Sequence, residues 1–198
     1  FYPGAMKHGH DVLLSEEFDS NSFFVIAPSG QKEMSFRVQE AVGRDIPYLF
    51  DPGQQITTLS GEELWEAASK SAVSIFNDYE WQLFREKTSK ELDDLTKLDV
   101  VIIVTQGAHG STIYTKEGDE QVGVAKPTKV VDPTGAGDAY RAGIIAGFVN
   151  KLDWKISCQL GATVASYAVE EYGTQEHNPS INDIKERYEN NFEKDFPL

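Results

Sequence analysis

The sequence predicts an α/β fold built on a parallel sheet, and three observations carry that prediction. Short apolar, β-branched runs alternate with longer amphipathic stretches along most of the chain, which is the pattern of strands joined by crossover helices. The run at residues 99–105 is apolar on both faces, as in a central strand covered by helices. At residues 130–149 a β-branched run, a Gly-Ala-Gly turn and an apolar small-residue stretch follow one another, which predicts strand, turn and helix. In such folds ligands bind at the carboxyl ends of the strands.

Composition limits the classes of protein to which the chain can belong. With 198 residues, of which 40% are hydrophobic, the chain can bury one sizeable core, and we expect a single domain over residues 1–198. A formal net charge of −14 argues against nucleic acid or an anionic membrane as a partner, because both require basic surfaces. Acidic solvent-facing helices account for that charge. No apolar run approaches the ~20 residues that a membrane-spanning helix needs.

Cysteine and histidine usage adds a further restriction. Cys158 is the only cysteine, which excludes an internal disulfide and a cysteine-based zinc cluster. This usage favours a reducing, cytoplasmic environment. His8 and His10 are two residues apart and cannot share a helix face, so we expect them on the surface rather than on a metal.

The first third of the chain predicts strands alternating with helices. We expect a short helix at residues 11–14, strands at 22–28 and 46–51, and an amphipathic helix at 31–42. The buried face of that last helix is expected to carry Met34, Val38, Ala41 and Val42. Ser60 and Glu63 form a capping box that starts the next helix. The apolar stripe of this helix is expected at Leu64, Ala67, Ala68 and Ala72.

A first candidate site follows the strand expected at residues 73–76. Asn77 and Glu80 stand in the first turn of the next helix, where an amide oxygen and a carboxylate three residues apart lie on one side. Such a pair can hold magnesium through its water shell. It can also form a capping box, with Asn77 as the N-cap and Glu80 reaching back to it. The two residues taken alone favour the capping interpretation.

A glycine-rich segment follows the clearest strand. Residues 89–98 are expected to be a polar helix or loop, and the strand at 99–105 leads into Thr105-Gln-Gly-Ala-His-Gly110. Taken alone, this segment is a turn that opens a hairpin. We expect its strands at 112–115 and 121–124, joined around Gly118 and Asp119.

The central stretch carries the second candidate site. The first turn of a helix presents unpaired N–H groups and the positive end of the helix dipole, so anions bind there. Gly135 and Gly137 leave that backbone accessible to a phosphate. A carboxylate beside an anion site is unfavourable unless it has a proton to collect, so we interpret Asp138 as a general base for a substrate hydroxyl.

The Gly-Ala-Gly-Asp stretch also has other interpretations. An isolated Gly-x-Gly-Asp more often serves only the turn and the helix dipole. A P-loop is excluded because no Gly-Lys-Ser/Thr follows, and a dinucleotide fingerprint is disfavoured because Tyr140 stands where a third glycine or alanine is needed.

The last third predicts three helices. The first is expected to pack closely through its small residues, Ala136, Ala139, Ala142, Gly143, Ala146 and Gly147. The second begins at Trp154 and ends before Gly173. Its buried side is expected to carry Leu160, Gly161, Val164, Ala165 and Ala168. An acidic surface helix at residues 181–192 closes the chain.

Three motifs resemble those of one enzyme family. Residues 132–138, with Ala139 and Gly143, resemble the signature of the ribokinase-type (PfkB) carbohydrate and nucleoside kinases. Asn-x-x-Glu at 77–80 resembles the second signature, and Thr-x-Gly-x-x-Gly at 105–110 resembles the segment that lines the nucleotide site. The resemblance implies a three-layer αβα ribokinase-like parallel sheet. It also implies an ATP-dependent phosphotransferase that acts on a primary hydroxyl of a nucleoside or sugar.

The same resemblance implies roles for the site residues. Asp138 is the catalytic base, and the N–H groups of Gly135, Ala136 and Gly137 form the anion hole. Asn77 and Glu80 are associated with magnesium and phosphate.

The nucleotide contacts implied by the resemblance are Thr105, Gly107, Gly110, Gly173 and Thr174. The last two lie at a corner that borders the adenine in the family. In many members this corner also holds a monovalent cation, such as K⁺, through backbone carbonyls.

The resemblance covers nearly the whole chain but only the later part of the family pattern. The family's glycine-rich substrate contacts, its hydroxyl-binding Asp and its β lid are not found before Phe1. We therefore expect a fold truncated at the N-terminus, without the lid and with an incomplete sugar site. Residues 1–6, 51–54 and 172–177 are most similar to adenosine-kinase-like members, which favours adenosine.

The alternative from another class is a nucleotide-binding module without independent catalysis, and a dehydrogenase is a more distant one. A small-molecule nucleoside or sugar is the expected partner. Whether the chain forms a homodimer stays open.

Overall fold

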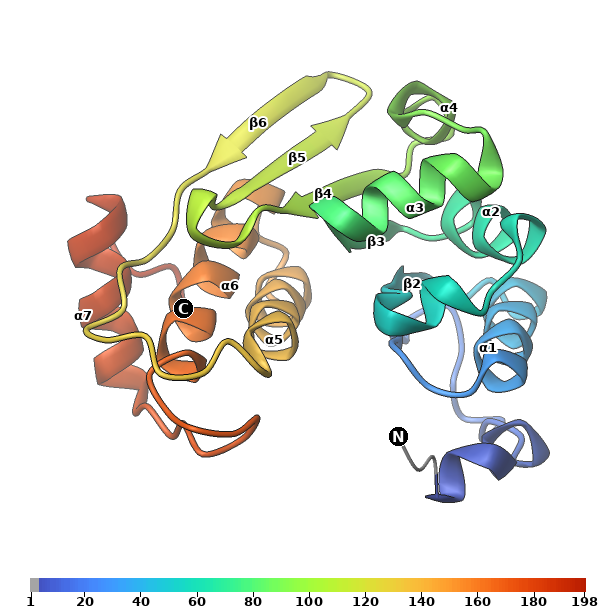
Figure 1. Cartoon of the computed structure of the whole chain (residues 1–198), viewed down its shortest axis with the longest axis horizontal. Coiled ribbons are helices and arrows are strands. Elements are labelled where there is room, and N and C mark those ends of the chain that lie inside the picture. Colours follow the sequence, from blue (N-terminus) through green and yellow to red (C-terminus); the bar gives the residue numbers. More distant parts are fainter. Residues whose placement is uncertain (1–3) are drawn as a thin grey trace. The chain divides into compact units, whose positions relative to one another are not determined.

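A computed structural model describes residues 4–198, which form two compact units (Figure 1). Unit 1 holds the residues up to 105 together with 114–119, and unit 2 holds 106–113 together with 120–198. Residues 1–3, part of the stretch compared with adenosine-kinase-like members, lie outside the described residues. The expectation of a single domain stays a prediction.

Six strands form one sheet in the order β1-β2-β3-β4-β5-β6. Their bounds are β1 (Phe24–Ile26), β2 (Tyr48–Phe50), β3 (Val73–Asn77), β4 (Val101–Thr105), β5 (Ser111–Thr115) and β6 (Gly118–Val122). The first four strands are parallel, and β5 and β6 form the predicted hairpin. The apolar run at residues 99–105 does lie inside the sheet, with β4 between β3 and β5.

Helices separate the strands, as the alternating pattern predicts. In unit 1 they are η1 (Gly4–Asp11), α1 (Gln31–Gly43), η2 (Gly53–Thr57), α2 (Gly61–Ser69), α3 (Asp78–Thr88) and α4 (Leu92–Thr96). In unit 2 they are η3 (Gly107–His109), α5 (Ala136–Val149), α6 (Trp154–Ala168) and α7 (Ile181–Phe192). Within residues 4–198 none of these helices has the length and apolar character needed to cross a membrane.

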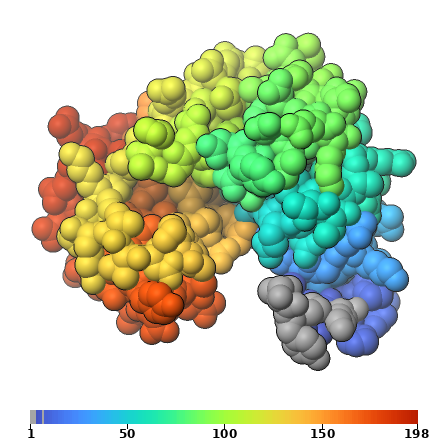
Figure 2. All heavy atoms as spheres, viewed as in Figure 1, coloured from blue at the N-terminus to red at the C-terminus, as the bar shows by residue number. Residues whose placement is uncertain are grey.

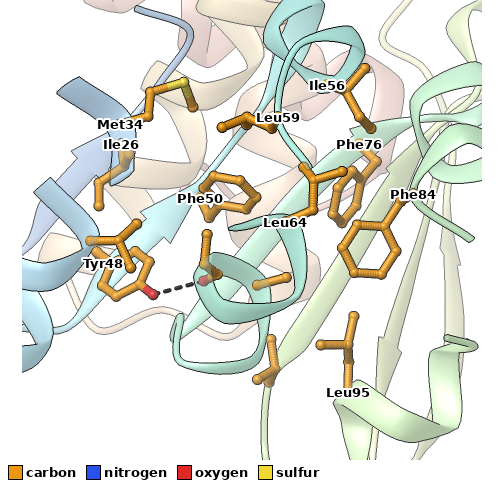
Figure 3. Packing of buried hydrophobic residues seen from close by; sticks show 14 of the residues in the cluster. Ile26, Met34, Tyr48, Phe50, Ile56, Leu59, Leu64, Phe76, Phe84 and Leu95 are labelled. Atoms are coloured by element: carbon orange, nitrogen blue, oxygen red, sulfur yellow. Dashed lines mark hydrogen bonds between the residues drawn. The ribbon is translucent and has the colours of Figure 1, made fainter. Parts of the chain in front are cut away.

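Unit 1 is held together by large apolar side chains (Figure 3). Phe50 from β2, Phe76 from β3 and Phe84 from α3 are fully buried, and the rings of Phe76 and Phe84 are 5.1 Å apart. Tyr48 is also buried, and its hydroxyl donates to the backbone oxygen of Ala67 at 2.7 Å. Burying each such side chain stabilises the fold by roughly 1.5–3 kcal/mol. This packing fixes the position at which β3 ends and α3 begins.

Unit 2 is held together by close backbone approach. A Cβ on Gly143 of α5 would lie 2.3 Å from the backbone nitrogen of Gly161 in α6, and one on Gly147 would lie 2.2 Å from Oγ of Ser157. The prediction that small residues allow these helices to pack closely is therefore confirmed. Helix α7 has the predicted bounds, and its buried Tyr188 donates a hydrogen bond to Oε1 of Gln159 at 2.9 Å.

The single cysteine lies in this packed helix pair. Cys158 is buried and makes no disulfide, and its burial raises the pKa of the thiol to about 12. The thiol is therefore neutral and unreactive at ordinary pH.

Several local predictions are wrong. The helix expected at residues 11–14 is replaced by η1, which ends at Asp11, because Leu13 is 74% exposed and has no core against which to pack. Val42 is 37% exposed rather than on the buried face of α1, and Ala72 lies beyond the end of α2. The hairpin turn lies before Gly118, which already begins β6.

The strand expected before α5 is also wrong. In the structure, residues 123–135 contain no strand, and Val130 and Val131 are 71% and 48% exposed. The N–H groups of Val131 and Asp132 both donate to the carbonyl of Val169, at 2.7 and 3.3 Å. The end of α6, rather than a neighbouring strand, therefore satisfies this backbone. Figure 2 shows the segment, in yellow to gold, at the surface.

Candidate active site

The N-terminal end of α5 is shaped by a glycine that no other residue can replace. Gly135 is the N-cap, with φ +87, a conformation that residues with a Cβ rarely adopt. A Cβ at this position would also lie 2.7 Å from the carbonyl oxygen of Thr174. The structure thus brings Gly135, predicted for the anion hole, next to Thr174, predicted to border the adenine.

The N–H groups at this helix end are only partly available for an anion. Ala136 donates its N–H to the carbonyl of Pro133 at 3.2 Å. The N–H groups of Gly135 and Gly137 meet no acceptor among residues 4–198, and a Cβ on Gly137 would have no atom within 4 Å. Two of the three predicted donors are therefore accessible at the positive end of the helix dipole.

Asp138 occupies the third helical position of α5, and its side chain is 67% exposed. Its Oδ1 accepts a hydrogen bond from the guanidinium of Arg141, whose side chain is only 13% exposed. Oδ2 has no donor among the described residues. The carboxylate is thus held at one oxygen and directed to solvent, an orientation in which it can receive a proton. Arg141 was not predicted from the sequence, although its i,i+3 spacing from Asp138 is a recognisable signal.

Asp132 connects two parts of this site, and its role was also missed. Its Oδ1 accepts the N–H of Thr134 at 2.9 Å, and its Oδ2 accepts the N–H of Gly173 at 3.1 Å. These hydrogen bonds, chiefly those from Thr134, lower the pKa of Asp132 below its ordinary value. The carboxylate therefore joins the start of the signature motif to the corner at Gly173.

A buried ion pair supports the loop that leads into the motif. Glu170 is 8% exposed and accepts hydrogen bonds from Oγ1 of Thr128 at 3.0 Å and from Nη2 of Arg187 at 3.2 Å, within an ion pair whose Nη1 and Oε1 are 2.9 Å apart. Burial acts to raise the pKa of Glu170, but the hydrogen bonds from Thr128 and Arg187 outweigh it, so the pKa is lowered. This carboxylate fastens the loop before α5 to the end of α6 and to α7.

In unit 1, Asn77 and Glu80 form a capping box at the start of α3. Oδ1 of Asn77 accepts the N–H of Glu80, and Oε2 of Glu80 accepts the N–H of Asn77, both at 2.8 Å. The capping interpretation is therefore realised. Asn77 lies opposite Thr105 in the register of β3 and β4, so the two residues share the carboxyl edge of the sheet.

Within residues 4–198 there is no group of three or more His, Cys, Asp or Glu side chains that could hold a metal ion. Asn77 and Glu80 each use one side-chain oxygen in the cap, so the pair suits a hydrated ion better than a directly coordinated one.

Gly107 and Gly110, the two glycines after β4, have different surroundings. Gly110 has φ +87, and a Cβ there would lie 2.1 Å from the carbonyl oxygen of Val122, so the approach of β6 requires glycine. Gly107 has φ +55 and open space around it. Thr105 donates its hydroxyl to the carbonyl of Phe76 at 3.4 Å. The nucleotide-contact role of these three residues stays a prediction.

Comparison with known sequences identifies related proteins. A family model described as pfkB family carbohydrate kinase matches residues 8–181. A nucleoside kinase of Methanocaldococcus jannaschii is 34% identical over 190 residues, which cover 96% of this chain and 62% of the relative. A nucleoside kinase of Methanothermobacter thermautotrophicus is 30% identical over 193 residues, covering 95% and 61%. The chain thus spans about three fifths of the length of these relatives.

Solved structures give the same result for the fold. The nucleoside kinase of Burkholderia thailandensis in complex with inosine superposes with a TM-score of 0.91 at 28% identity, covering 98% of this chain and 63% of that chain. The Methanocaldococcus jannaschii nucleoside kinase, described as an archaeal member of the ribokinase family, gives 0.87 at 32% identity, covering 96% and 62%. These similarities confirm the predicted ribokinase-like α/β fold.

Proposed function

The chain belongs to the pfkB family of carbohydrate kinases, and on that premise we propose that it transfers a phosphoryl group from ATP to a nucleoside hydroxyl. The two archaeal nucleoside kinases support a nucleoside as the acceptor. Similarity of residues 51–54 and 172–177 to adenosine-kinase-like members favours adenosine, and a sugar is the alternative. The observation that carries the proposal is the α5 terminus, where an exposed carboxylate stands beside accessible N–H groups.

In the proposed reaction, Asp138 accepts the proton of the attacking hydroxyl at Oδ2, while Arg141 holds Oδ1. The N–H groups of Gly135, Ala136 and Gly137 stabilise the negative charge on the transferring phosphoryl group. Ala136 joins them only if its bond to Pro133 opens. The anion hole and the base then belong to a single helical turn, so their spacing is fixed by backbone geometry.

Asn77 and Glu80 are proposed to position magnesium through its water shell. When bound, magnesium supplies charge neutralisation on the phosphates. The capping box serves this role by fixing both side chains at the end of β3, and water-mediated contact leaves the cap intact.

The remaining proposed contacts concern the nucleotide. Thr105, Gly107 and Gly110 are proposed to line its site, and Gly173 and Thr174 to border the adenine and a monovalent cation such as K⁺. Both units are proposed to belong to one ribokinase-like domain, which functions in a reducing cytoplasm.

Substitution of the proposed base tests the function. Asp138→Asn should lower turnover by about 10²–10⁴-fold, the size of a general-base contribution, while the Kd for ATP with magnesium changes little. Asp183→Asn is the matched control, because Asp183 occupies the same third position in α7 and should leave turnover near normal. The measurements are phosphorylation of a nucleoside panel and calorimetric titration with ATP.

Each outcome of this experiment distinguishes the candidates. Near-normal turnover in Asp138→Asn removes the base from the mechanism. ATP binding by the unmodified chain without phosphorylation of any nucleoside or sugar supports a nucleotide-binding module instead.

A second substitution tests the magnesium role. Glu80→Gln preserves a capping box, since glutamine serves in that position, but removes the charge. We expect several-fold more magnesium to be needed for half-maximal activity. Glu63→Gln makes the same change in the capping box of α2 and should leave the magnesium dependence unchanged. If activity depends on magnesium concentration in the same way in both variants and in the unmodified chain, Asn77 and Glu80 serve only to cap α3.

A further inference from the structure

The first part of the segment that carries the anion-binding turn is fastened by the hydrogen bonds of Thr128 to Glu170 and of Lys126 to Asn191. Residues 123–135 belong to no helix or strand, and Pro133 has no N–H to donate. Three further links join residues 130–135 to the corner that follows α6. They are the N–H groups of Val131 and Asp132 on the carbonyl of Val169, the bond from Gly173 to Asp132, and the approach of Gly135 to Thr174.

We propose that Asp132 is a positioning residue of the phosphoryl-transfer site, which sets the α5 terminus against the corner at Gly173 and Thr174. This inference rests on the proposed function. Asp132 acts through the backbone of its neighbours, and no contact with substrate is required of it. Of the three links, the bond from Gly173 is the only one that involves a side chain, so it can be removed by substitution without changing the backbone.

The chemistry of the link requires a carboxylate. Asp132 receives two backbone N–H groups at once, from Thr134 and from Gly173. An ionised carboxylate offers acceptors at both oxygens, whereas an asparagine of the same shape offers one acceptor and one NH₂ donor. Hydrogen bonds to a charged acceptor are also stronger than neutral ones. With its pKa lowered by these bonds, Asp132 keeps both acceptors at neutral pH.

The hydrogen bond from Gly173 to Asp132 matters because the α5 terminus and the corner at Gly173 and Thr174 have little room to shift. The virtual Cβ of Gly135 lies 2.7 Å from the Thr174 oxygen, so the helix end and the corner already touch. A shift of the corner relative to the turn moves the N–H groups that are proposed to hold the phosphoryl oxygens. Catalysis is sensitive to displacements on the order of 1 Å at such groups.

Asp132→Asn is the substitution that tests this inference. The asparagine can keep the bond from Thr134 through Oδ1, but it then presents an NH₂ group to the N–H of Gly173. Asp19→Asn is the matched control, because Oδ1 of Asp19 accepts the N–H of Asn21 at 2.9 Å. The spacing and length equal those of the bond from Thr134 to Asp132, but Asp19 belongs to unit 1, whereas Gly173 belongs to unit 2.

Two readouts are measured on the full chain. Amide hydrogen exchange at Gly173 should become about tenfold faster in Asp132→Asn, the size expected for losing one hydrogen bond to a charged acceptor. For phosphoryl transfer, kcat should fall by about the same factor while KM for the nucleoside changes less than twofold. Asp19→Asn should change neither quantity.

The results separate this inference from the proposed function. Unchanged exchange at Gly173, or equal effects in both variants, overturns the role of Asp132. A normal kcat in Asp132→Asn, when the Gly173 amide of the same variant exchanges faster, also overturns it. If the unmodified chain transfers no phosphoryl group, the proposed function fails, and a titration with ATP and magnesium replaces kcat. Several-fold weaker ATP binding in Asp132→Asn alone then supports the positioning of an anion site, and equal binding overturns it.

Discussion

The two units of this chain solve the packing problem in opposite ways. Unit 1 fills its interior with large rings and aliphatic side chains. Unit 2 brings helix backbones together at glycines and adds buried polar pairs such as Ser111 with Tyr140 and Arg187 with Glu170. In unit 1, large buried side chains supply the packing. In unit 2, the missing side chains of glycines allow two helices to pack closely. Stability should therefore respond in opposite ways to added side-chain volume in the two units.

Removing a large side chain from unit 1 should have the largest effect on stability. Phe84 is fully buried and stacks 5.3 Å from Trp81. Phe84→Ala leaves a cavity, and we expect the free energy of unfolding to fall by about 3–5 kcal/mol. Urea denaturation followed by circular dichroism measures it. A loss below ~1 kcal/mol would mean that this core can collapse into the space, contrary to the close packing described.

Adding a single methyl group should change stability in opposite directions in the two units. Gly143→Ala places a Cβ 2.3 Å from the backbone of Gly161, and overpacking of this kind should cost about 1–3 kcal/mol. Gly43→Ala, at the end of α1 in unit 1, meets no atom within 4 Å and should stabilise by up to about 0.5–1 kcal/mol. Thermal unfolding of both variants gives the sign of each change. Changes of the same sign would contradict the contrast between the units.

The buried carboxylate of Glu170 should make the free energy of unfolding of unit 2 depend on pH. Because the folded-state pKa of Glu170 is lowered from 4.5, its stabilisation is present above that pH and is lost as the pH falls through the folded pKa. Glu170→Gln should cost about 1–3 kcal/mol at pH 7 and should flatten the loss of stability below pH ~4.5. Unfolding free energies at several pH values between 3 and 7 test this prediction. Glu171→Gln, next along the chain and half-exposed, should change the profile little.

Features that depend on neighbouring residues could be predicted from the sequence. The Ser60 and Glu63 capping box, the alternation that gives the parallel strands, and the bounds of α7 each follow from short-range rules, and each is present. Close packing of α5 was also foreseeable, because its glycines and alanines repeat on the helix.

Features that depend on distant partners could not be predicted. Val130 and Val131 have the residue types of a strand, but the carbonyl of Val169, far along the chain, receives the N–H of Val131. Asp132 has a local signal in Asp-Pro-Thr, which is typical of an Asx turn. Its second partner, Gly173, lies 41 residues away and has no local signature.

The glycine contacts between α5 and α6 also bear on movement. Where two helices contact each other at glycines, few flexible side chains lie between them, so the helices slide or rotate less easily. We therefore expect α5 to hold the turn at its N-terminus in a fixed position. Under the proposed function, any conformational change during phosphoryl transfer should therefore leave α5 and α6 in place and displace the loops around them. Amides inside α5 and α6 should then be among the slowest to exchange, even while those of residues 123–134 respond to added nucleotide.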